Sequence, residues 1–356
     1  MTDIAIVGAG MAGASLAAAL SGAANVLILE AESEPGYHAT GRSAAFWSES
    51  YGGPRIQPLT SASGPFLAEN GLLRPRGAIH VAGGEEVARL DHMRASFPDV
   101  LLKEMDRAEL EAAIPGLRPA WTHGLAEPTC ADIDVAALHA LYLRQARAGG
   151  ARLVTDARLL SALRDGGRWR IETETGACEA DVLVNAAGAW ADDVARRCGE
   201  PMLSIRPFRR TIAQLRVNPP APLDLPLIVD ASERFYFKSE AGGRLWLSPH
   251  DETLSEPCDS APEEIDVAIA IDRLERVVDW RVAAVERKWA GLRSFAPDRL
   301  PVYGFGPGGN GFFWFAGQGG FGIQTAPAAA ALGAALLLGG APALDPAPYS
   351  ALRFAN

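Results

Sequence analysis

The first thirty residues constrain the fold more than any other part of this chain. An apolar run at 3–7 leads into Gly8-Ala9-Gly10-Met11-Ala12-Gly13, and a stretch of small residues follows. A second apolar run at 26–29 ends in Glu30. This order predicts a strand, a tight turn, a helix and a second strand, which is the βαβ unit that binds dinucleotides.

The glycines and the acid have separate tasks in such a unit. Gly8 permits the tight turn, Gly10 lets a pyrophosphate approach the backbone, and Gly13 lets the helix lie close to the strand. Free amides at the helix start, aided by the helix dipole, attract phosphates. Glu30 is placed to bind both hydroxyls of an adenosine ribose and would repel a 2′-phosphate, so the pattern favours FAD or NAD over NADP.

Composition excludes several other classes of protein. The chain has 356 residues and a net charge of −10, which predicts about two domains and argues against a nucleic-acid surface. Its four cysteines and six histidines are scattered without metal-ligand spacing, so we expect reduced thiols, no metal and a cytoplasmic protein. We expect no signal peptide, and the apolar segment 326–338 is shorter than the roughly 20 residues of a membrane span.

Nucleotide-fold elements recur in the middle and near the end of the chain. Buried strands are expected at 181–185 and 311–316, each leading into glycines and a helix. We therefore predict an α/β fold in which two domains are interleaved. A Rossmann-like FAD-binding domain would comprise 1–45, 132–205 and 290–356, and an α+β substrate domain on a mixed or antiparallel sheet would comprise 46–131 and 206–289.

The late glycine-rich segment bears on the choice of cofactor. Gly317-Gln318-Gly319-Gly320 follows the strand at 311–316 and precedes a long Ala/Leu helix. Backbone amides at that helix start could face the pyrimidine edge of a flavin, which gains negative charge on reduction. The alternative is a glycine cluster that only packs the strand against the helix, but together with the N-terminal unit the segment favours FAD.

Four segments carry a likeness to a known family. They are Gly36-Tyr37-His38-Ala39-Thr40-Gly41-Arg42-Ser43-Ala44-Ala45, Val184-Asn185-Ala186-Ala187-Gly188-Ala189-Trp190, Trp289-Ala290-Gly291-Leu292-Arg293-Ser294-Phe295, and residues 312–325. In this order and spacing the chain resembles the D-amino-acid oxidase superfamily of flavoproteins. Within that superfamily it is similar to glycine oxidases and D-amino-acid dehydrogenases, above all the D-arginine dehydrogenase branch.

The resemblance implies a set of cofactor-binding residues. FAD would be held by the N-terminal turn, the Gly-Arg-Ser-Ala segment and the C-terminal helix start. The implied positions are Gly8, Gly10, Gly13, Glu30, Arg42, Ser43, Ala44, Gly319 and Gln324. Covalent attachment would need a cysteine from the C-terminal region near the flavin, and the last cysteine is Cys258, so we expect non-covalent FAD.

The resemblance also implies the reaction and its catalytic residues. A D-amino acid would transfer a hydride from its CH–NH group to flavin N5, and the imino acid would hydrolyse to a 2-oxo acid and ammonia. Arg293 would hold the substrate carboxylate, because a guanidinium pairs with it through two parallel hydrogen bonds. Arg210, Tyr236 and Tyr51 match further active-site positions, although Arg210 could instead solvate a strand edge and Tyr236 could belong to the core.

Three positions bear on the substrate side chain. The D-arginine branch has a glutamate near the position of Arg76, so Arg76 would repel a cationic substrate if it faces the pocket and would do nothing if it faces solvent. Phe46 and Trp47 replace more polar residues and would make that wall apolar. His38 precedes the FAD-binding segment and is expected to be structural.

Two other functions stay open at this point. Related folds oxidise 2-hydroxy acids with the same carboxylate clamp, usually with a histidine base. A non-catalytic flavin-binding protein would hold FAD without reacting. The partners we expect are a small amino-acid substrate and an electron acceptor that is oxygen, a quinone or a carrier protein.

Overall fold

Six strands form a sheet around the N-terminal βαβ unit, in the order β20-β21-β13-β1-β2-β9. The structure is a computed structural model that describes residues 3–355. All neighbours in this sheet are parallel except β20, which runs antiparallel to β21. The strands are β1 (Ile4–Val7), β2 (Val26–Leu29), β9 (Arg152–Val154), β13 (Val182–Asn185), β20 (Val302–Phe305) and β21 (Phe312–Ala316).

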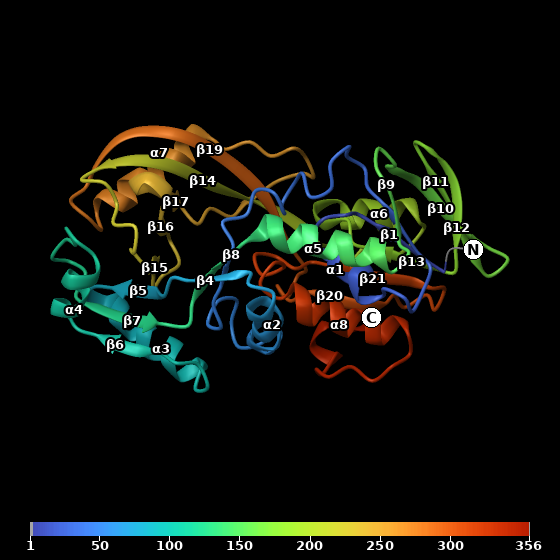
Figure 1. Cartoon of the computed structure of the whole chain (residues 1–356), viewed down its shortest axis with the longest axis horizontal. Coiled ribbons are helices and arrows are strands. Elements are labelled where there is room, and N and C mark those ends of the chain that lie inside the picture. The colour runs from blue at the N-terminus through green and yellow to red at the C-terminus, as the bar shows by residue number, and fades with distance from the viewer. Residues whose placement is uncertain (1–2, 356) are drawn as a thin grey trace.

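Both faces of this sheet are buried, as a parallel sheet requires. Side chains alternate along β1, so Ile4 and Ile6 join one apolar cluster while Ala5 and Val7 join another on the opposite face. Helices α1, α5 and α8 lie together beside the sheet in the right half of Figure 1. The helices of this part are α1 (Met11–Ala19), α5 (Val135–Ala148), α6 (Ala191–Arg197) and α8 (Ala326–Leu337).

A nine-stranded mixed sheet occupies the other half of the molecule (Figure 1). Its path is β18-β14-β17-β16-β15-β5-β7-β6, with β19 on the free side of β14, and only β5 and β15 pair in parallel. Its strands are β5 (Ala78–Ala82), β6 (Lys103–Met105), β7 (His123–Glu127), β14 (Arg206–Asn218), β15 (Leu227–Asp230), β16 (Tyr236–Glu240), β17 (Arg244–Ser248), β18 (Thr253–Leu254) and β19 (Arg281–Phe295). The helices here are α3 (Val87–Ser96), α4 (Arg107–Ala113) and α7 (Glu264–Glu275). The predicted α/β fold class with its mixed second sheet is confirmed.

Strands β14 and β19 form one long antiparallel ribbon that reaches from this sheet toward the centre of the molecule (Figure 1). Its register runs from Arg206 opposite Phe295 to Asn218 opposite Arg281. Within this ribbon Phe208 on β14 lies opposite Arg293 on β19. Arg210 lies two residues farther along β14, so it is a diagonal neighbour of Arg293. Diagonal neighbours of this kind share one face of a sheet and lie within reach of long side chains.

Smaller elements complete the chain. A hairpin turn at Asp165–Gly167 joins two strands of a three-stranded sheet. The remaining elements are β10 (Leu159–Asp165), β11 (Arg168–Thr173), β12 (Gly176–Ala180), β3 (Phe46–Trp47), β4 (Leu73–Pro75), β8 (Ala131–Ile133), α2 (Gln57–Glu69), and 3₁₀ turns at Gly84–Glu86, Gly188–Trp190, Ala241–Gly243, Ala347–Tyr349 and Ala351–Phe354. Among residues 3–355, no helix has both the length and the apolar character needed to cross a membrane.

Candidate active site

The N-terminal turn adopts the conformation that its glycines predict. Gly8 has φ +102° and its amide donates to the Leu29 carbonyl at 2.8 Å. A Cβ at Gly8 would lie 2.6 Å from the Ala186 carbonyl oxygen, and one at Gly13 would lie 1.9 Å from the Gly8 carbonyl oxygen. Gly13 therefore packs α1 against the turn, whereas Gly8 and Gly10 line a cavity.

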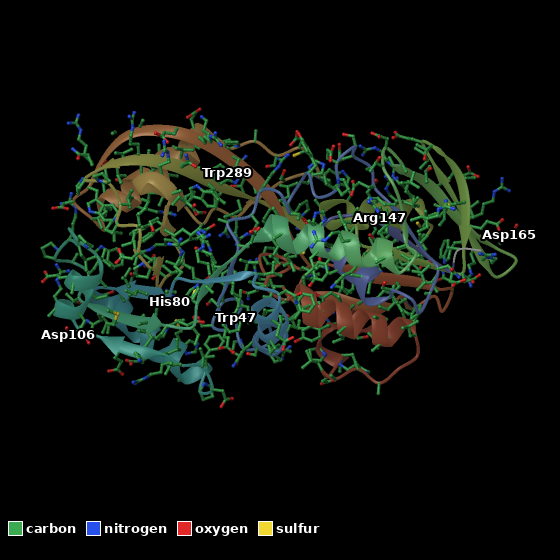
Figure 2. The ribbon with its side chains drawn as sticks, viewed as in Figure 1. Trp47, His80, Asp106, Arg147, Asp165 and Trp289 are labelled. Atoms are coloured by element: carbon green, nitrogen blue, oxygen red, sulfur yellow. The ribbon has the colours of Figure 1, made fainter. Side chains whose placement is uncertain are left out.

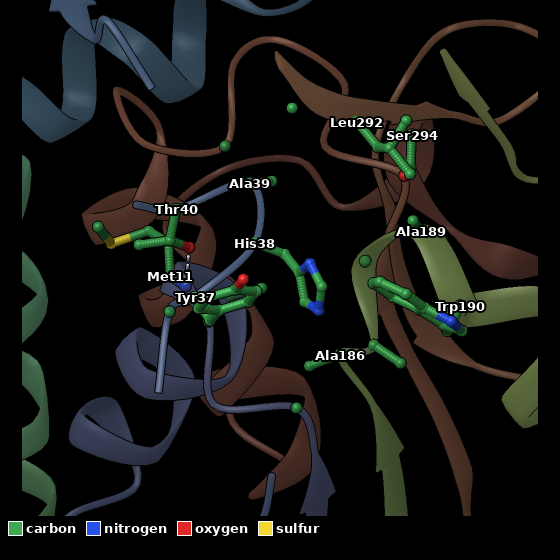
Figure 3. A pocket seen from close by; sticks show the side chains of 18 of the residues that line it. Met11, Tyr37, His38, Ala39, Thr40, Ala186, Ala189, Trp190, Leu292 and Ser294 are labelled. Atoms are coloured by element: carbon green, nitrogen blue, oxygen red, sulfur yellow. Dashed lines mark hydrogen bonds between the residues drawn. The ribbon is translucent and has the colours of Figure 1, made fainter. Parts of the chain in front are cut away.

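Glu30 stands at one end of that cavity. Its carboxylate accepts from the Ala9 amide at 2.7 Å and from the Glu32 amide at 3.0 Å. Thr40 is also close to the turn, because its hydroxyl accepts from the Met11 amide at 2.9 Å (Figure 3). The acid is thus held beside the turn, where an adenosine ribose would have to bind.

The cavity is long and is lined by segments distant in sequence. Besides the turn and Glu30, its walls come from residues 36–44, 186–190, 291–294 and 318–323. Figure 3 shows His38 between Tyr37 and Trp190, with ring centroids 5.0 and 4.6 Å away. His38 Nε2 also lies 2.9 Å from the Glu32 carboxylate.

Arg42 binds a loop at 258–260 that forms part of the cavity wall. Its guanidinium donates to the Ser260 carbonyl at 2.9 Å and to the Ala290 carbonyl at 3.2 Å, and it pairs with Asp259. The hydrogen bond from Arg42 is the main reason that the pKa of Asp259 is lowered. Arg42, Ser43 and Ala44 all line the cavity, as does Cys258 from the covering loop.

The late glycine-rich loop meets the same cavity. Gly319 has φ +55°, its amide donates to the Ser294 carbonyl at 2.8 Å, and a Cβ there would lie 2.1 Å from the Phe295 ring. One detail differs from expectation: α8 begins only at Ala326, so the cavity is lined by the loop residues 318–320, 322 and 323 rather than by a helix start. The left-handed glycines at 317 and 319 delay the helix, because they turn the chain before it can begin.

Gln324 lies away from the cavity, which corrects its expected role as a cofactor contact. Its amide nitrogen donates to the Tyr51 carbonyl at 3.1 Å and to the Thr60 hydroxyl at 2.9 Å, and its oxygen accepts from the Ser48 amide. Both polar atoms of the Gln324 side chain are therefore hydrogen-bonded to other residues of the protein. Gln324 therefore anchors the segment that carries Tyr51.

Two arginines converge at the end of the cavity opposite Glu30. Arg293 donates to the Tyr51 hydroxyl at 2.8 Å and has no carboxylate within ion-pair distance in the described part of the chain. Arg210 is only 4% exposed and donates to the Asp251 carbonyl at 2.7 Å and to Glu252 at 3.1 Å. Its Nη1 is buried without a partner.

The electrostatics at this end reflect two nearby cations. Burial and the Arg293 charge lower the pKa of Arg210 to about 10. Tyr236 is buried beside both arginines and lines the cavity with them, and burial raises the pKa of its hydroxyl. The structure thus brings together the four predicted catalytic residues, Arg293, Arg210, Tyr236 and Tyr51. Of the two guanidiniums, Arg210 pairs with Glu252, and Arg293 has no carboxylate partner among the described residues.

The three residues predicted to face the substrate side chain are separated. The Phe46 ring lies 5.1 Å from Tyr51 and 6.0 Å from Tyr236, beside the arginines. Trp47 is held against α2 instead, because its indole nitrogen donates to the Thr60 carbonyl at 2.9 Å. Trp47 lines neither this cavity nor the second one described below.

Arg76 also lies outside both cavities, so the expected repulsion of a cationic substrate has no structural basis. Its Nε donates to Asp132 at 2.5 Å, and its Nη1 donates to the Leu225 carbonyl at 2.9 Å and the Ser239 hydroxyl at 3.1 Å. Asp132 also pairs with Lys238 at 2.7 Å. The guanidinium is held by this partly buried ion cluster, which explains the correction.

Glu127 is a buried acid that the sequence did not single out. Its carboxylate accepts from the Ser48 hydroxyl at 2.8 Å, from the Glu49 amide at 2.7 Å and from the Ser50 hydroxyl. Burial raises its pKa. Glu127 is distant in sequence from the segment it holds, so no local pattern could have revealed that it positions the residues leading to Tyr51.

A second cavity adjoins the arginine end and was also not predicted. Tyr236 lines both cavities, and Tyr51, Phe46, His80 and His250 line the second. The ring of His250 lies 5.8 Å from that of Tyr236, and its Nδ1 donates to the Glu233 carbonyl. Burial and the nearby Arg210 and Arg293 charges lower the pKa of His250 to about 2.

This arrangement fits FAD. An acid stands at one end of the first cavity, glycines without side chains leave room beside the backbone amides, and a positive site closes the other end. The residues placed to hold it are Gly8, Gly10, Glu30, Arg42, Ser43, Ala44 and Gly319.

Comparison with known proteins points the same way. A family described as "FAD dependent oxidoreductase" (DAO) matches residues 3–336. The chain is 30% identical over 256 residues to a glycine oxidase from Pseudomonas aeruginosa, covering 70% of this chain and 67% of that enzyme. It is 26% identical to the glycine oxidase from Geobacillus kaustophilus, covering 99% and 97%.

Solved structures agree in fold. The crystal structure of the Geobacillus kaustophilus glycine oxidase superposes with a TM-score of 0.85 at 25% identity, covering 99% of this chain and 98% of that one. An L-proline dehydrogenase from P. horikoshii superposes with a TM-score of 0.87 at 19% identity, covering 99% and 98%, a likeness that concerns the fold alone.

Proposed function

The chain belongs to the DAO family of FAD dependent oxidoreductases, and on that premise we propose that it oxidises the CH–NH group of a D-amino acid. The imino acid formed would be hydrolysed by water to a 2-oxo acid and ammonia. FAD, when bound, supplies the acceptor for the hydride that leaves the substrate α-carbon. The protein supplies binding and orientation.

The observation that carries this proposal is the pair of arginines: Arg293 has no carboxylate partner among the described residues, and Arg210, although paired with Glu252, keeps one guanidinium nitrogen without a hydrogen bond. A buried guanidinium nitrogen without a partner is costly, and Arg210 Nη1 is such an atom. Arg293 stands beside it without a carboxylate partner among the described residues. A substrate carboxylate would satisfy both groups through charge-assisted hydrogen bonds, which are the strong ones.

Orientation accounts for much of the expected rate. A carboxylate held by Arg293 and Arg210 fixes the α-carbon, and the Tyr51 hydroxyl holds the Arg293 fork in turn. Holding reacting atoms in an aligned geometry can supply several kcal/mol, roughly 7–11 in well-oriented systems. The preference for D-amino acids rests on the four segments that resemble the D-amino-acid oxidase superfamily. The two relatives named glycine oxidase support an amino-acid substrate but no handedness, because glycine has no stereocentre.

Oxidation of a 2-hydroxy acid is less well supported. That reaction usually recruits a base whose pKa lies near the working pH to remove the hydroxyl proton. The histidine nearest the arginines, His250, has its pKa lowered to about 2 by burial and by the two guanidiniums. An imidazole with so low a pKa is a poor base and would not remove the proton of a substrate hydroxyl. A neutral amine needs no such base, so the amino acid is the better substrate.

The test is anaerobic reduction of the FAD-loaded enzyme, which is monitored as the loss of the visible flavin absorbance. D-amino acids, L-amino acids and 2-hydroxy acids are compared at equal concentrations. Reduction by D-amino acids alone supports the proposal, reduction by hydroxy acids alone overturns it, and the absence of any reduction favours a non-catalytic flavin-binding protein.

The role of the clamp is tested with Arg293→Lys. Lysine keeps the charge but loses the planar fork, so kcat/KM should fall roughly 10- to 100-fold, the value of one or two charge-assisted bonds. Arg287→Lys is the matched control, because Arg287 lies exposed on the same strand. Equal activity of both variants would refute the clamp.

A further inference from the structure

The second cavity begins where the carboxylate site ends. It has a volume of about 690 Å³, and Tyr236 lines it together with Tyr51, whose hydroxyl contacts Arg293. A molecule whose carboxylate is bound by Arg293 therefore has this space beside its α-carbon. The space is large enough for a side chain of considerable size.

The inner wall of this cavity is one face of the nine-stranded sheet. On β5 and β15 the side chains alternate, so Ile79 and Ile228 enter the core while Ala78, His80, Leu227 and Val229 face the cavity. Helix α3 and the residue after it close the opposite side with Met93 and Phe97. These side chains make much of the cavity wall apolar, although Ser48, Ser50 and His250 also belong to its lining.

The cavity offers no interior charge to a substrate. Its buried carboxylate, Asp230, is already paired with Arg234 through two of its guanidinium nitrogens. Burial lowers the pKa of His80 to about 4, so that imidazole is neutral at physiological pH. The remaining charged residues of the lining, Arg89 and Glu233, are exposed at its rim.

His80 adds one hydrogen-bonding group to this wall. It lies on β5 in the half of the molecule that contains the nine-stranded sheet (Figure 2), and its Nε2 is buried without a partner. A buried polar atom without a hydrogen bond is unfavourable unless a ligand supplies one. An uncharged hydroxyl or N–H on a bound side chain could do so.

We propose that the second cavity is the side-chain subsite and that the substrate is a D-amino acid with a bulky, uncharged side chain, with His80 favouring one that carries a polar group, such as a phenol. This inference rests on the proposed function for its reaction, and it adds the substrate class. A cationic side chain would find no free carboxylate inside and would lie close to two guanidiniums. An anionic one would find no cation inside, since the two guanidiniums bind the α-carboxylate, and glycine would leave the cavity unfilled.

The first experiment compares reduction of the FAD-loaded enzyme by D-phenylalanine, D-leucine and D-tyrosine with reduction by glycine, D-alanine, D-arginine and D-glutamate. The bulky neutral group should give kcat/KM values at least about tenfold higher, since each extra apolar group in a fitted pocket is worth 10-fold or more. D-arginine, D-glutamate or glycine as the best substrate would overturn the inference while leaving the reaction intact.

Two variants locate the side chain. Val229→Phe fills the cavity and should lower kcat/KM for D-phenylalanine and D-tyrosine without lowering it for D-alanine, whereas Val285→Phe, at an exposed site, should change neither. His80→Leu should abolish any advantage of D-tyrosine over D-phenylalanine, and His123→Leu, at an exposed histidine, should preserve it. If a folded and FAD-loaded variant has the same loss of kcat/KM for every substrate, the assignment is contradicted.

A binding measurement separates this inference from the reaction. 3-Phenylpropanoate carries the carboxylate and the side chain but no amine, and its binding can be followed by perturbation of the flavin spectrum. It should bind more tightly than acetate, and Val229→Phe should remove the difference. Tighter binding of 3-phenylpropanoate supports the side-chain subsite even if no amino acid reduces the flavin. A failure of reduction would overturn only the proposed function. Equal binding of the two carboxylates would overturn the subsite.

Discussion

A single methyl group at Gly320 should damage the carboxylate clamp while leaving the fold intact. A Cβ at this position would lie 2.7 Å from the Tyr51 hydroxyl and 2.8 Å from Arg293 Nη1. The first distance falls 0.7 Å short of the 3.4 Å at which ordinary contact begins. Both atoms are ends of flexible side chains and can retreat, so Gly320→Ala should fold, and the change should appear in the clamp.

The expected loss can be worked from the bond that moves. Displacing Arg293 by several tenths of an ångström weakens a charge-assisted hydrogen bond to the substrate carboxylate, worth about 1.5–3 kcal/mol. At about 1.4 kcal/mol per factor of ten, kcat/KM should fall roughly 10- to 100-fold. The backbone at Gly320 is not left-handed, so alanine introduces no strain of its own.

The assay is steady-state turnover of the best amino-acid substrate by the FAD-loaded variant. FAD content is measured separately from the ratio of flavin to protein absorbance, because Gly320 also lines the cofactor cavity. Gly340→Ala is the control, since a Cβ there would approach its nearest neighbour, the Ala335 carbonyl oxygen, only to 3.6 Å. Unchanged kcat/KM in a fully loaded Gly320→Ala enzyme would refute the reasoning.

Three further predictions concern the cofactor and stability. Gly13→Ala should abolish FAD binding or folding, because its Cβ would lie 1.9 Å from the rigid Gly8 carbonyl oxygen; flavin content after purification measures this. FAD should be non-covalent, so acid precipitation should release all flavin to the supernatant and Cys258→Ser should change nothing, although Cys258 lines the cavity. Burial raises the pKa of Glu127 above 4.5, so its protonated form favours the folded state and that contribution is lost as the pH rises through the folded pKa; Glu127→Gln should flatten the fall in melting temperature from pH 4.5 upward.

Local patterns predicted those elements whose signals are contained in a few residues. Asp134 begins α5 as its N-cap by accepting from the Ala137 amide, and the Asp165–Gly167 turn closes a hairpin; both features depend on a few neighbouring residues. The βαβ unit and the strands at 182–185 and 312–316 were equally clear, since each is an apolar run that ends in glycines. Short-range chemistry determines these features.

Elements that depend on distant partners were harder to predict. No strand was predicted over Arg281–Phe295, which the structure shows as β19. Its outer part is rich in exposed charged residues and is stabilised by pairing with β14, some seventy residues earlier in the chain. The sequence of this segment has no hydrophobic periodicity that would predict a strand.

The same distinction applies to the candidate site. Residue types and the family resemblance pointed to Arg293, Arg210, Tyr236 and Tyr51, which the structure brings together. The direction of a long side chain is not encoded locally: Arg76 turns to Asp132, which is 56 residues away. The second cavity was not predicted because its walls belong to four strands, a helix and loops that meet only in the folded chain.

The order of strands in the six-stranded sheet has a consequence for synthesis of the protein. The N-terminal β1 pairs with β13, and β13 in turn pairs with β21, which ends at Ala316. A ribosome adding about 5–20 residues per second needs roughly 15–60 s to reach that point. Until then the nascent chain exposes unpaired strand edges, so chaperones have longest to act on this half, and the cofactor can be captured only when nearly the whole chain has been made.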